Sequence, residues 1–312
     1  NWLIPEDQTE PYCAACRHNR MIPDLSLIEN LSHWQKIEIA KHRLFYTLLA
    51  LRLPLATKAE DSAGLAFDFI ADQSTPSGHI PAMTGHENGL ITINLFEADD
   101  VERERRRSQM GEPYRTLLGH FRHEIAHYYW DRIVANSANL DGFRSIFGDE
   151  RKDYAAAIQQ HYANGPPPNW PENFVSAYAS SHPWEDFAET WAHYFHTVDT
   201  LEMAGAFGLS VNPRLPKGSK RLAAAINFDP HSASMDRLVE AWLPLTYAMN
   251  SINRSMGMQD LYPFILTPAA IVKINFVHSC IHSQEGWQRD GTARGALKAI
   301  VAGLKAGLPS QL

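Results

Sequence analysis

The chain has 312 residues, of which 45% are hydrophobic and 20% are charged, and this is the composition of an ordinary globular protein. Its formal net charge of −7 argues against broad binding to a phosphate backbone, and no apolar run reaches the ~20 residues of a membrane span. We therefore expect neither nucleic acid nor a membrane as a partner. No secretory signal is visible, so we expect a cytoplasmic protein, although a segment lost ahead of Asn1 would hide such a signal.

Residues 1–23 show no regular pattern but contain Cys13 and Cys16, which have the spacing of a zinc knuckle. Two cysteines are half of a four-ligand structural zinc site. Because the chain begins with Asn1 rather than Met, we hypothesise that the partner cysteines lie upstream. The alternative is two thiols in a loop. The third cysteine, Cys280, is expected to be buried, and three cysteines do not suggest a disulfide framework.

The next predicted elements are helical and then extended. Apolar residues between 25 and 53 predict one or two helices, and residues 65–71 and 89–96 have the pattern of strands. Asn88 and Gly89 mark a turn immediately before the second strand. The arginines between 103 and 107 are interrupted by Glu104, so we interpret this segment as a solvated helix face.

A helix is predicted over residues 113–136, with Pro113 at its first position. An apolar stripe with helical spacing follows, made of Tyr114, Leu117, Leu118, Phe121, Ile125, Tyr128 and Tyr129. His123 and His127 lie roughly 120–160° away from Phe121 on this helix. We therefore expect the two histidines to face a cleft or solvent rather than the core.

The same helix contains the pattern H-E-x-x-H, formed by His123, Glu124 and His127. Residues four apart on a helix are neighbours, so two imidazoles at this spacing can share one zinc ion. The glutamate beside the first histidine can reach a water molecule on the metal. This pattern predicts a metal-assisted hydrolase with one catalytic Zn²⁺. The alternative is a surface helix that happens to carry two histidines.

A catalytic zinc site usually takes a third protein ligand. A second amphipathic helix is predicted over residues 183–199, and Glu185 and Glu189 share one flank of it. Glu185 is our first candidate for the third ligand, with Glu189 accepting a hydrogen bond from a ligand imidazole. Asp131 and His193 are the second and third candidates. The alternative for both glutamates is a solvated, charge-paired helix face.

Two other features complete the prediction. His120 precedes His123 by three residues and is expected to be a neighbour of the site rather than a ligand. Beyond the second helix, residues 234–255 and 268–282 have helical patterns, and residues 284–312 form a weakly patterned tail. Few strands and many helices predict a mostly helical α+β fold.

The chain resembles the bacterial zinc-binding metallopeptidases that carry a zinc ribbon ahead of a gluzincin-type peptidase domain. The similar segments are 13–16 (C-A-A-C), 22–25 (I-P-D-L), 120–132 (H-F-R-H-E-I-A-H-Y-Y-W-D-R), 174–178 (F-V-S-A-Y) and 182–191 (H-P-W-E-D-F-A-E-T-W). Together the resemblance covers roughly residues 1–250. It implies a ribbon remnant at 1–23, a zincin-like domain at 24–283 and the tail at 284–312.

Residues 185–189 are also similar to the E-x-F-A-E helix of lethal-factor-like peptidases. That similarity implies that Glu185, the first glutamate, is the zinc ligand. It further implies that Tyr178, seven residues before the ligand, helps to stabilise an oxyanion. The zincin fold implies a small antiparallel sheet before the H-E-x-x-H helix, with an edge that can hold an extended peptide.

These observations together predict a zinc-dependent endopeptidase or aminopeptidase acting on a peptide or protein substrate. His123, His127 and Glu185 hold zinc, and Glu124 is the general base. Two alternatives from other classes stay open: a zinc-stabilised binding module without activity, and a hydrolase of non-peptide amides. Substrate preference and oligomeric state do not follow from the sequence.

Overall fold

The computed structural model describes residues 2–71, 73–75, 78–80, 84–110, 114–213 and 222–283. The chain divides into two units. Unit 1 comprises Asn1–Arg106, Thr116–Glu124 and Ser283–Leu312, and unit 2 comprises Arg107–Arg115 and Ile125–His282. The division falls inside helix α3 (Leu117–Ile133). The predicted tail at 284–312 and the predicted helix start at Pro113 lie outside the described residues.

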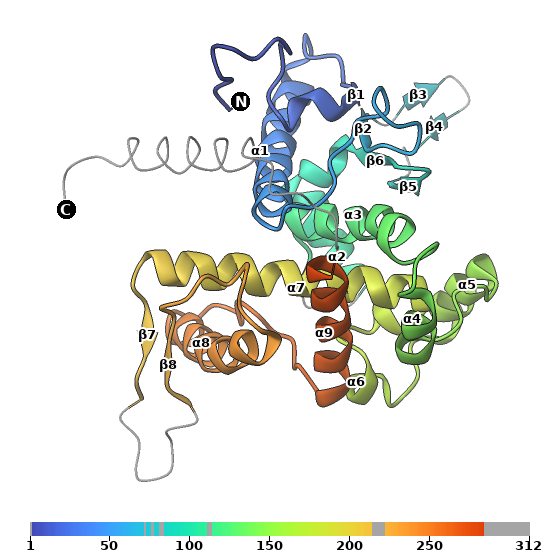
Figure 1. Ribbon diagram of the computed structural model, residues 1–312. Coiled ribbons are helices and arrows are strands. Elements are labelled where there is room, and N and C mark those ends of the chain that lie inside the picture. Colours follow the sequence, from blue (N-terminus) through green and yellow to red (C-terminus); the bar gives the residue numbers. More distant parts are fainter. Residues whose placement is uncertain are drawn as a thin grey trace. The chain divides into compact units, whose positions relative to one another are not determined.

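Unit 1 contains the sheet and the helix that covers it (Figure 1). Its elements are η1 (Cys16–His18), β1 (Asn19–Met21), α1 (Ile28–Ala50), β2 (Ala66–Ile70), β3 (Gln73–Thr75), β4 (Gly78–Ile80), β5 (Gly85–Glu87), β6 (Leu90–Asn94), η2 (Leu95–Ala98) and the start of α2 (Asp100–Met110). The apolar pattern between residues 25 and 53 thus forms one helix, α1. Both predicted strands are present, as β2 and β6.

The four-stranded sheet has the order β1-β2-β6-β5 and is mixed. Strand β2 pairs parallel with both β1 and β6, and only β5 and β6 are antiparallel. The small sheet expected before the H-E-x-x-H helix is thus present, and it is mixed rather than antiparallel. The antiparallel pair is joined by the predicted turn, in which Asn88 and Gly89 both have positive φ. A side chain at Gly89 would meet the Gly64 carbonyl oxygen at 2.5 Å.

The core of unit 1 forms where β2 and β6 meet α1. Phe67 and Phe69 of β2 are buried opposite Ile91 and Ile93 of β6. Phe45 of α1 packs against Phe67, with ring centroids 6.0 Å apart. Large apolar side chains buried on both elements provide most of the free energy that holds the helix on the sheet.

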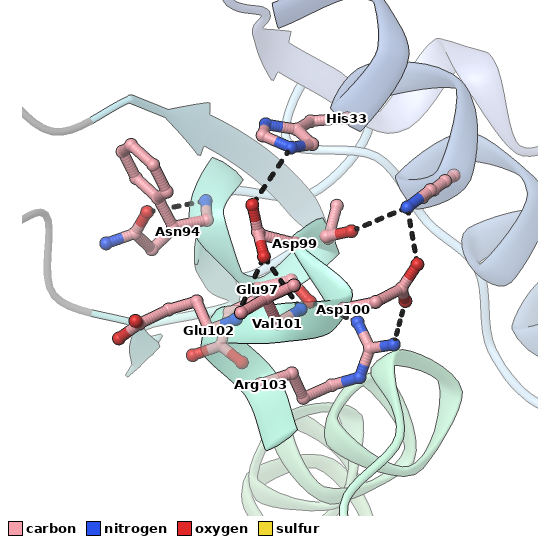
Figure 2. Close-up of polar contacts among 11 residues, drawn as sticks. His33, Asn94, Glu97, Asp99, Asp100, Val101, Glu102 and Arg103 are labelled. Carbon is pink, nitrogen blue, oxygen red and sulfur yellow. Dashed lines mark hydrogen bonds and ion pairs between the residues drawn. The ribbon is translucent and has the colours of Figure 1, made fainter. Parts of the chain in front are cut away.

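A polar junction connects the end of the sheet to α2 (Figure 2). Asp99 caps α2, because its Oδ1 accepts hydrogen bonds from the backbone N–H groups of Val101 and Glu102 at 2.8 and 2.9 Å. Arg103 donates to the backbone oxygen of Glu97 at 2.8 Å. These contacts fix the backbone at Glu97, whose side chain is buried.

Unit 2 is almost entirely helical (Figure 1). Besides the second part of α3, its elements are α4 (Leu140–Phe147), α5 (Tyr154–Asn164), α6 (Trp170–Asn173), η3 (Tyr178–Ser180), α7 (Pro183–Ala206), β7 (Ser210–Val211), β8 (Ala224–Ala225), α8 (Met235–Ser255) and α9 (Pro268–His282). The described part of the chain contains no helix long and apolar enough to cross a bilayer.

Helix α7 is the centre of unit 2, and α8, α9 and η3 pack on it. Trp191 stacks on Tyr129 of α3 at 5.2 Å between ring centroids, and Phe187 meets Phe143 of α4 at 5.9 Å. Asp186 and Lys273 form a buried ion pair of 2.6 Å that joins α7 to α9. This packing holds the first turn of α7 in a fixed position beside α3.

Candidate metal centre

Helix α3 carries the H-E-x-x-H residues one turn apart. His123 is 9% exposed and His127 is 3% exposed, so both imidazoles are buried. They are therefore not open to solvent, and the expectation that they face a cleft stays a prediction. Residues 121–129 are all buried, so in this part of the helix the polar face is covered as well as the apolar stripe.

In unit 2 the polar face of α3 is covered by the start of α7. The indole of Trp184 lies against His127, with ring centroids 3.8 Å apart. Helix α7 begins at Pro183, and the His182 side chain accepts a hydrogen bond from the backbone N–H of Trp184. Pro183 and its capping histidine therefore orient the first turn, which contains Glu185.

Glu185 brings a carboxylate to the two histidines. Its Oε1 lies 3.7 Å from His127 Nε2, and the side chain is 1% exposed. One nitrogen or oxygen atom from each of His123, His127 and Glu185 lies within 4.8 Å of the others. Asp131 and His193, the other candidates for a third ligand, are absent from this group of described residues.

Tyr154, at the start of α5, was not singled out from the sequence. Its hydroxyl donates a 2.9 Å hydrogen bond to Glu185 Oε1. It lies 31 residues before Glu185, so no local pattern connects the two. A hydrogen bond of this kind orients a carboxylate that would bind a metal ion.

The other two candidates for the third ligand have different surroundings. His193 is buried and its Nδ1 lies 2.7 Å from the hydroxyl of Tyr262. Burial lowers the pKa of His193 to about 4, so the ring is neutral at pH 7. Asp131 is an exposed residue of α3, and partial desolvation of its carboxyl group by the surrounding protein raises its pKa to about 6.

Glu189 lies one turn after Glu185 on α7. Its Oε2 accepts a 2.6 Å hydrogen bond from the hydroxyl of Ser176. That contact ties α7 to the segment that leads into η3, where Tyr178 lies. The expected hydrogen bond from a ligand imidazole to Glu189 stays a prediction.

Tyr178 is located in η3, which packs on α7. Burial, reinforced by the charge of Glu185, raises the pKa of this phenol far above its ordinary value. The hydroxyl group therefore keeps its proton throughout the physiological range and can act as a hydrogen-bond donor. Its neighbours include His161, at 5.9 Å between ring centroids.

Glu124 and its partners lie in unit 1. His120 Nε2 is 3.2 Å from Glu124 Oε1, and His120 Nδ1 is 3.4 Å from Glu97 Oε2. Burial alone would lower the pKa of His120, but hydrogen bonds to Glu124 and Glu97 outweigh it and raise the pKa to about 9. His120 is therefore protonated at pH 7 and lies between two carboxylates. Glu97 was not identified from the sequence.

Cys13 and Cys16 also lie in unit 1, shortly before η1 and at its first residue. Cys13 is buried and Cys16 is partly buried, and both sulfur atoms lie near the His42 side chain of α1. Cys280 is buried in α9, as expected, and burial raises its pKa to about 12.

Comparison with known proteins identifies the family of the chain. A family model described as "Putative zinc-binding metallo-peptidase" matches residues 30–280. The chain belongs to this metallopeptidase family. A zinc-ribbon model matches residues 1–27, ahead of that segment. Because the family is described as zinc-binding, we ask whether the donor atoms of the site fit a zinc ion.

The relatives are bacterial. Uncharacterized proteins of Mycobacterium tuberculosis strain H37Rv and of Mycobacterium bovis are each 42% identical to the chain over 286 residues. The alignment covers 90% of this chain and 79% of each relative. No solved structure matches the chain.

The donor atoms on α3 and α7 fit the metal of this family. Zinc binds imidazole nitrogen and carboxylate oxygen at about 2.0–2.2 Å, which puts neighbouring ligand atoms of a tetrahedral site roughly 3.3–3.5 Å apart. The 3.7 Å between His127 Nε2 and Glu185 Oε1 is close to that separation. Two imidazoles and one carboxylate are also the protein ligands of a common type of catalytic zinc site.

Proposed function

We propose that the protein is a zinc-dependent peptidase of gluzincin type, in which His123, His127 and Glu185 hold the metal. The observation that supports this most directly is the convergence of their three donor atoms within 4.8 Å, with the two histidines on the helix that also carries Glu124. A zinc ion bound there would polarise a carbonyl group and lower the pKa of water toward ~7.

Glu124 is the general base. Its carboxylate takes a proton from the attacking water and transfers it to the amine that leaves when the peptide bond breaks. His120 holds Oε1 of that carboxylate through the 3.2 Å contact, and Glu97 in turn orients His120. Glu124 therefore keeps one orientation for both proton transfers.

Tyr178 donates a hydrogen bond to the oxyanion that develops on the carbonyl oxygen. A donor aimed at charge that appears only in the transition state lowers the barrier more than it strengthens substrate binding. The high pKa of the phenol supports this role, because a phenolate would repel the oxyanion. Glu189 positions the segment before η3 through its hydrogen bond to Ser176.

The first test is the zinc content of the purified protein, followed by cleavage of a peptide library and of matched non-peptide amides. Glu124→Gln is expected to retain zinc and to lose about 10²–10⁴-fold in kcat. Glu29→Gln, at an exposed position in the first turn of α1, is the matched control and keeps full activity.

The outcomes separate the candidate functions. Full activity in Glu124→Gln would rule out this general base. A zinc-loaded wild-type protein that cleaves only non-peptide amides would assign a different substrate class, and one that cleaves neither would leave a binding module.

A further inference from the structure

Another group of metal-ligating side chains lies at the C-terminal end of α7, where β7 and β8 follow the helix (Figure 1). Asp199 and Glu202 are three residues apart on α7, so they share one face of the helix. His231 lies in the segment between β8 and α8. One oxygen atom of each carboxylate and one ring nitrogen of His231 all lie within 4.8 Å of one another. The three residues belong to unit 2, and none of them is part of the candidate metal centre.

His231 brings a buried nitrogen atom to the two carboxylates. Its side chain is 9% exposed, and its Nε2 has no hydrogen-bond partner among the described residues. That nitrogen lies 4.0 Å from Asp199 Oδ1 and 3.9 Å from Glu202 Oε2, and both distances are longer than a hydrogen bond. Burial of a polar atom without a hydrogen bond costs free energy, and an ion bound between the three side chains would remove that cost.

The other ring nitrogen of His231 faces a third carboxylate. Its Nδ1 lies 3.4 Å from Asp229 Oδ1, which also accepts a 3.0 Å hydrogen bond from the backbone N–H of His231. A carboxylate only accepts hydrogen bonds, so this contact favours the tautomer with the proton on Nδ1. The lone pair of Nε2 is then available to a metal ion. A metal-bound histidine typically has this arrangement, in which the second ring nitrogen donates to a carboxylate or a carbonyl oxygen.

The two segments that carry these side chains are in close contact. A Cβ atom at Gly205 of α7 would lie 3.2 Å from the backbone oxygen of Ile226, which follows β8 and is buried. This contact fixes the end of α7 beside the segment that leads to His231. A groove of about 410 Å³, with Glu202 and Asp229 in its lining, gives an ion a path of entry.

Two carboxylates and one imidazole suit a divalent transition-metal ion. Imidazole nitrogen binds Zn²⁺ readily and carboxylate oxygen suits Mn²⁺, whereas Ca²⁺ and Mg²⁺ prefer sites made of oxygen alone. A tetrahedral zinc site holds its donors roughly 3.3–3.5 Å apart, so these donors would have to move together by about 0.5 Å. Asp199 and Glu202 are partly exposed, so their side chains have the freedom to make this movement.

We propose that Asp199, Glu202 and His231 bind one divalent metal ion, Zn²⁺ or Mn²⁺, that fastens the C-terminal end of α7 to the segment before α8. Water from the groove completes the coordination of the ion. The ion shares no ligand with the candidate metal centre and takes no part in the proposed peptide hydrolysis. Its role is to hold the residues that follow β8 against α7.

Metal binding to protein that EDTA has freed of metal tests this site, with Mn²⁺ and Zn²⁺ as separate probes. The electron paramagnetic resonance signal of free Mn²⁺ measures one ion, and competition with a chromogenic chelator measures the other. For at least one of them, the wild type should bind one ion more per chain than His231→Gln or Glu202→Gln. The ion that shows this difference is the occupant. Glu240→Gln, at an exposed position on α8, is the matched control and should bind as the wild type does.

His123→Ala distinguishes this site from the candidate metal centre. The difference caused by His231→Gln should persist when His123→Ala is also present, so either proposal can fail without the other. Equal binding of both ions by the wild type, His231→Gln and Glu202→Gln would overturn the proposal. His231 would then form only ion pairs with the two carboxylates.

Hydrogen exchange in the wild-type protein provides a test that needs no folded variant. At an ion concentration about tenfold above Kd, amides in residues 199–206 and 226–231 should exchange about tenfold more slowly than in EDTA. Mass spectrometry of the peptides that cover these segments measures the rates. Rates that neither ion changes in either segment would rule the site out.

Discussion

The imidazole of His120 lies 3.2 Å from the carboxylate of Glu124, one helical turn later on α3. The other ring nitrogen faces Glu97, whose backbone is fixed by the junction between the sheet and α2. The sheet of unit 1 therefore contributes to the site through a chain of contacts. Glu97 holds His120, and His120 holds the group that we propose as the general base.

We predict that His120→Asn lowers kcat about 10–100-fold, the range expected when the partner of a metal-site residue is removed. KM and zinc content should remain close to those of the wild type, because His120 touches neither the substrate nor the ion in this proposal. Steady-state kinetics and elemental analysis measure these quantities. His86→Asn, at a partly exposed position in β5, is the control. A parallel rise in KM and loss of zinc would indicate a structural role instead.

The raised pKa of His120 leads to a predicted pH dependence of the protein's stability. Its pKa is about 9 in the folded protein, above the ordinary histidine value of 6.5 that applies to the unfolded chain, so the folded state holds the proton more tightly. The stabilisation is fully present below about pH 6.5 and is lost as the pH rises through about 9. In metal-free protein, the difference in Tm between wild type and His120→Asn should therefore shrink between pH 6.5 and 9. A constant difference over that range would contradict this pKa.

The elements with a long periodic pattern could be predicted from the sequence. Helix α7 begins at the predicted Pro183, α9 has the predicted bounds, and α1 and β6 lie within their predicted ranges. These elements follow from the local spacing of apolar residues, and that spacing can be read from the sequence itself. The parallel pairing of β2 with β6 could not be predicted, because the direction of pairing depends on how the connecting segments cross.

The candidate site likewise has one part that the sequence predicts and one part that it does not. His123, Glu124 and His127 share one helical turn, so their pattern is visible in the sequence. Tyr154 and Glu97 reach their partners only through tertiary packing, over separations that no local pattern encodes. The burial of both histidines was also missed, since periodicity identifies the face packed on the core but not what covers the opposite face.

Tyr154→Phe tests the support of the proposed ligand Glu185. The substitution removes only the hydroxyl group that donates to Glu185 Oε1, so we expect the affinity for zinc to fall about 10–100-fold. Competition with a chelator of known affinity measures the change. Tyr162→Phe, on the same helix at an exposed position, is the control and should bind zinc as the wild type does. An unchanged affinity in Tyr154→Phe would show that this hydrogen bond does not support the metal centre.

Tyr178→Phe tests the proposed oxyanion donor. Loss of one such donor typically costs about 10²–10³-fold in kcat. Zinc content should be unchanged, and KM should change little because the hydrogen bond forms only as charge develops. Tyr247→Phe, at an exposed position on α8, serves as the control. If kcat survives in Tyr178→Phe, another group must stabilise the oxyanion.

The buried ion pair of Asp186 and Lys273 leads to a prediction about the free energy of unfolding. Asp186→Asn leaves the Lys273 ammonium group in the interior without its carboxylate, so we expect a loss of about 3–5 kcal/mol in the free energy of unfolding. Lys273→Met should destabilise the protein to a similar degree. The buried carboxyl group of Asp186 then lacks its cationic partner, so its pKa rises further above the present value of about 7. The double variant leaves no isolated charge and should lose less than the sum of the two single losses. Urea unfolding of the four proteins measures the coupling. Strictly additive losses would mean that α7 is held against α9 by apolar packing and not by this ion pair.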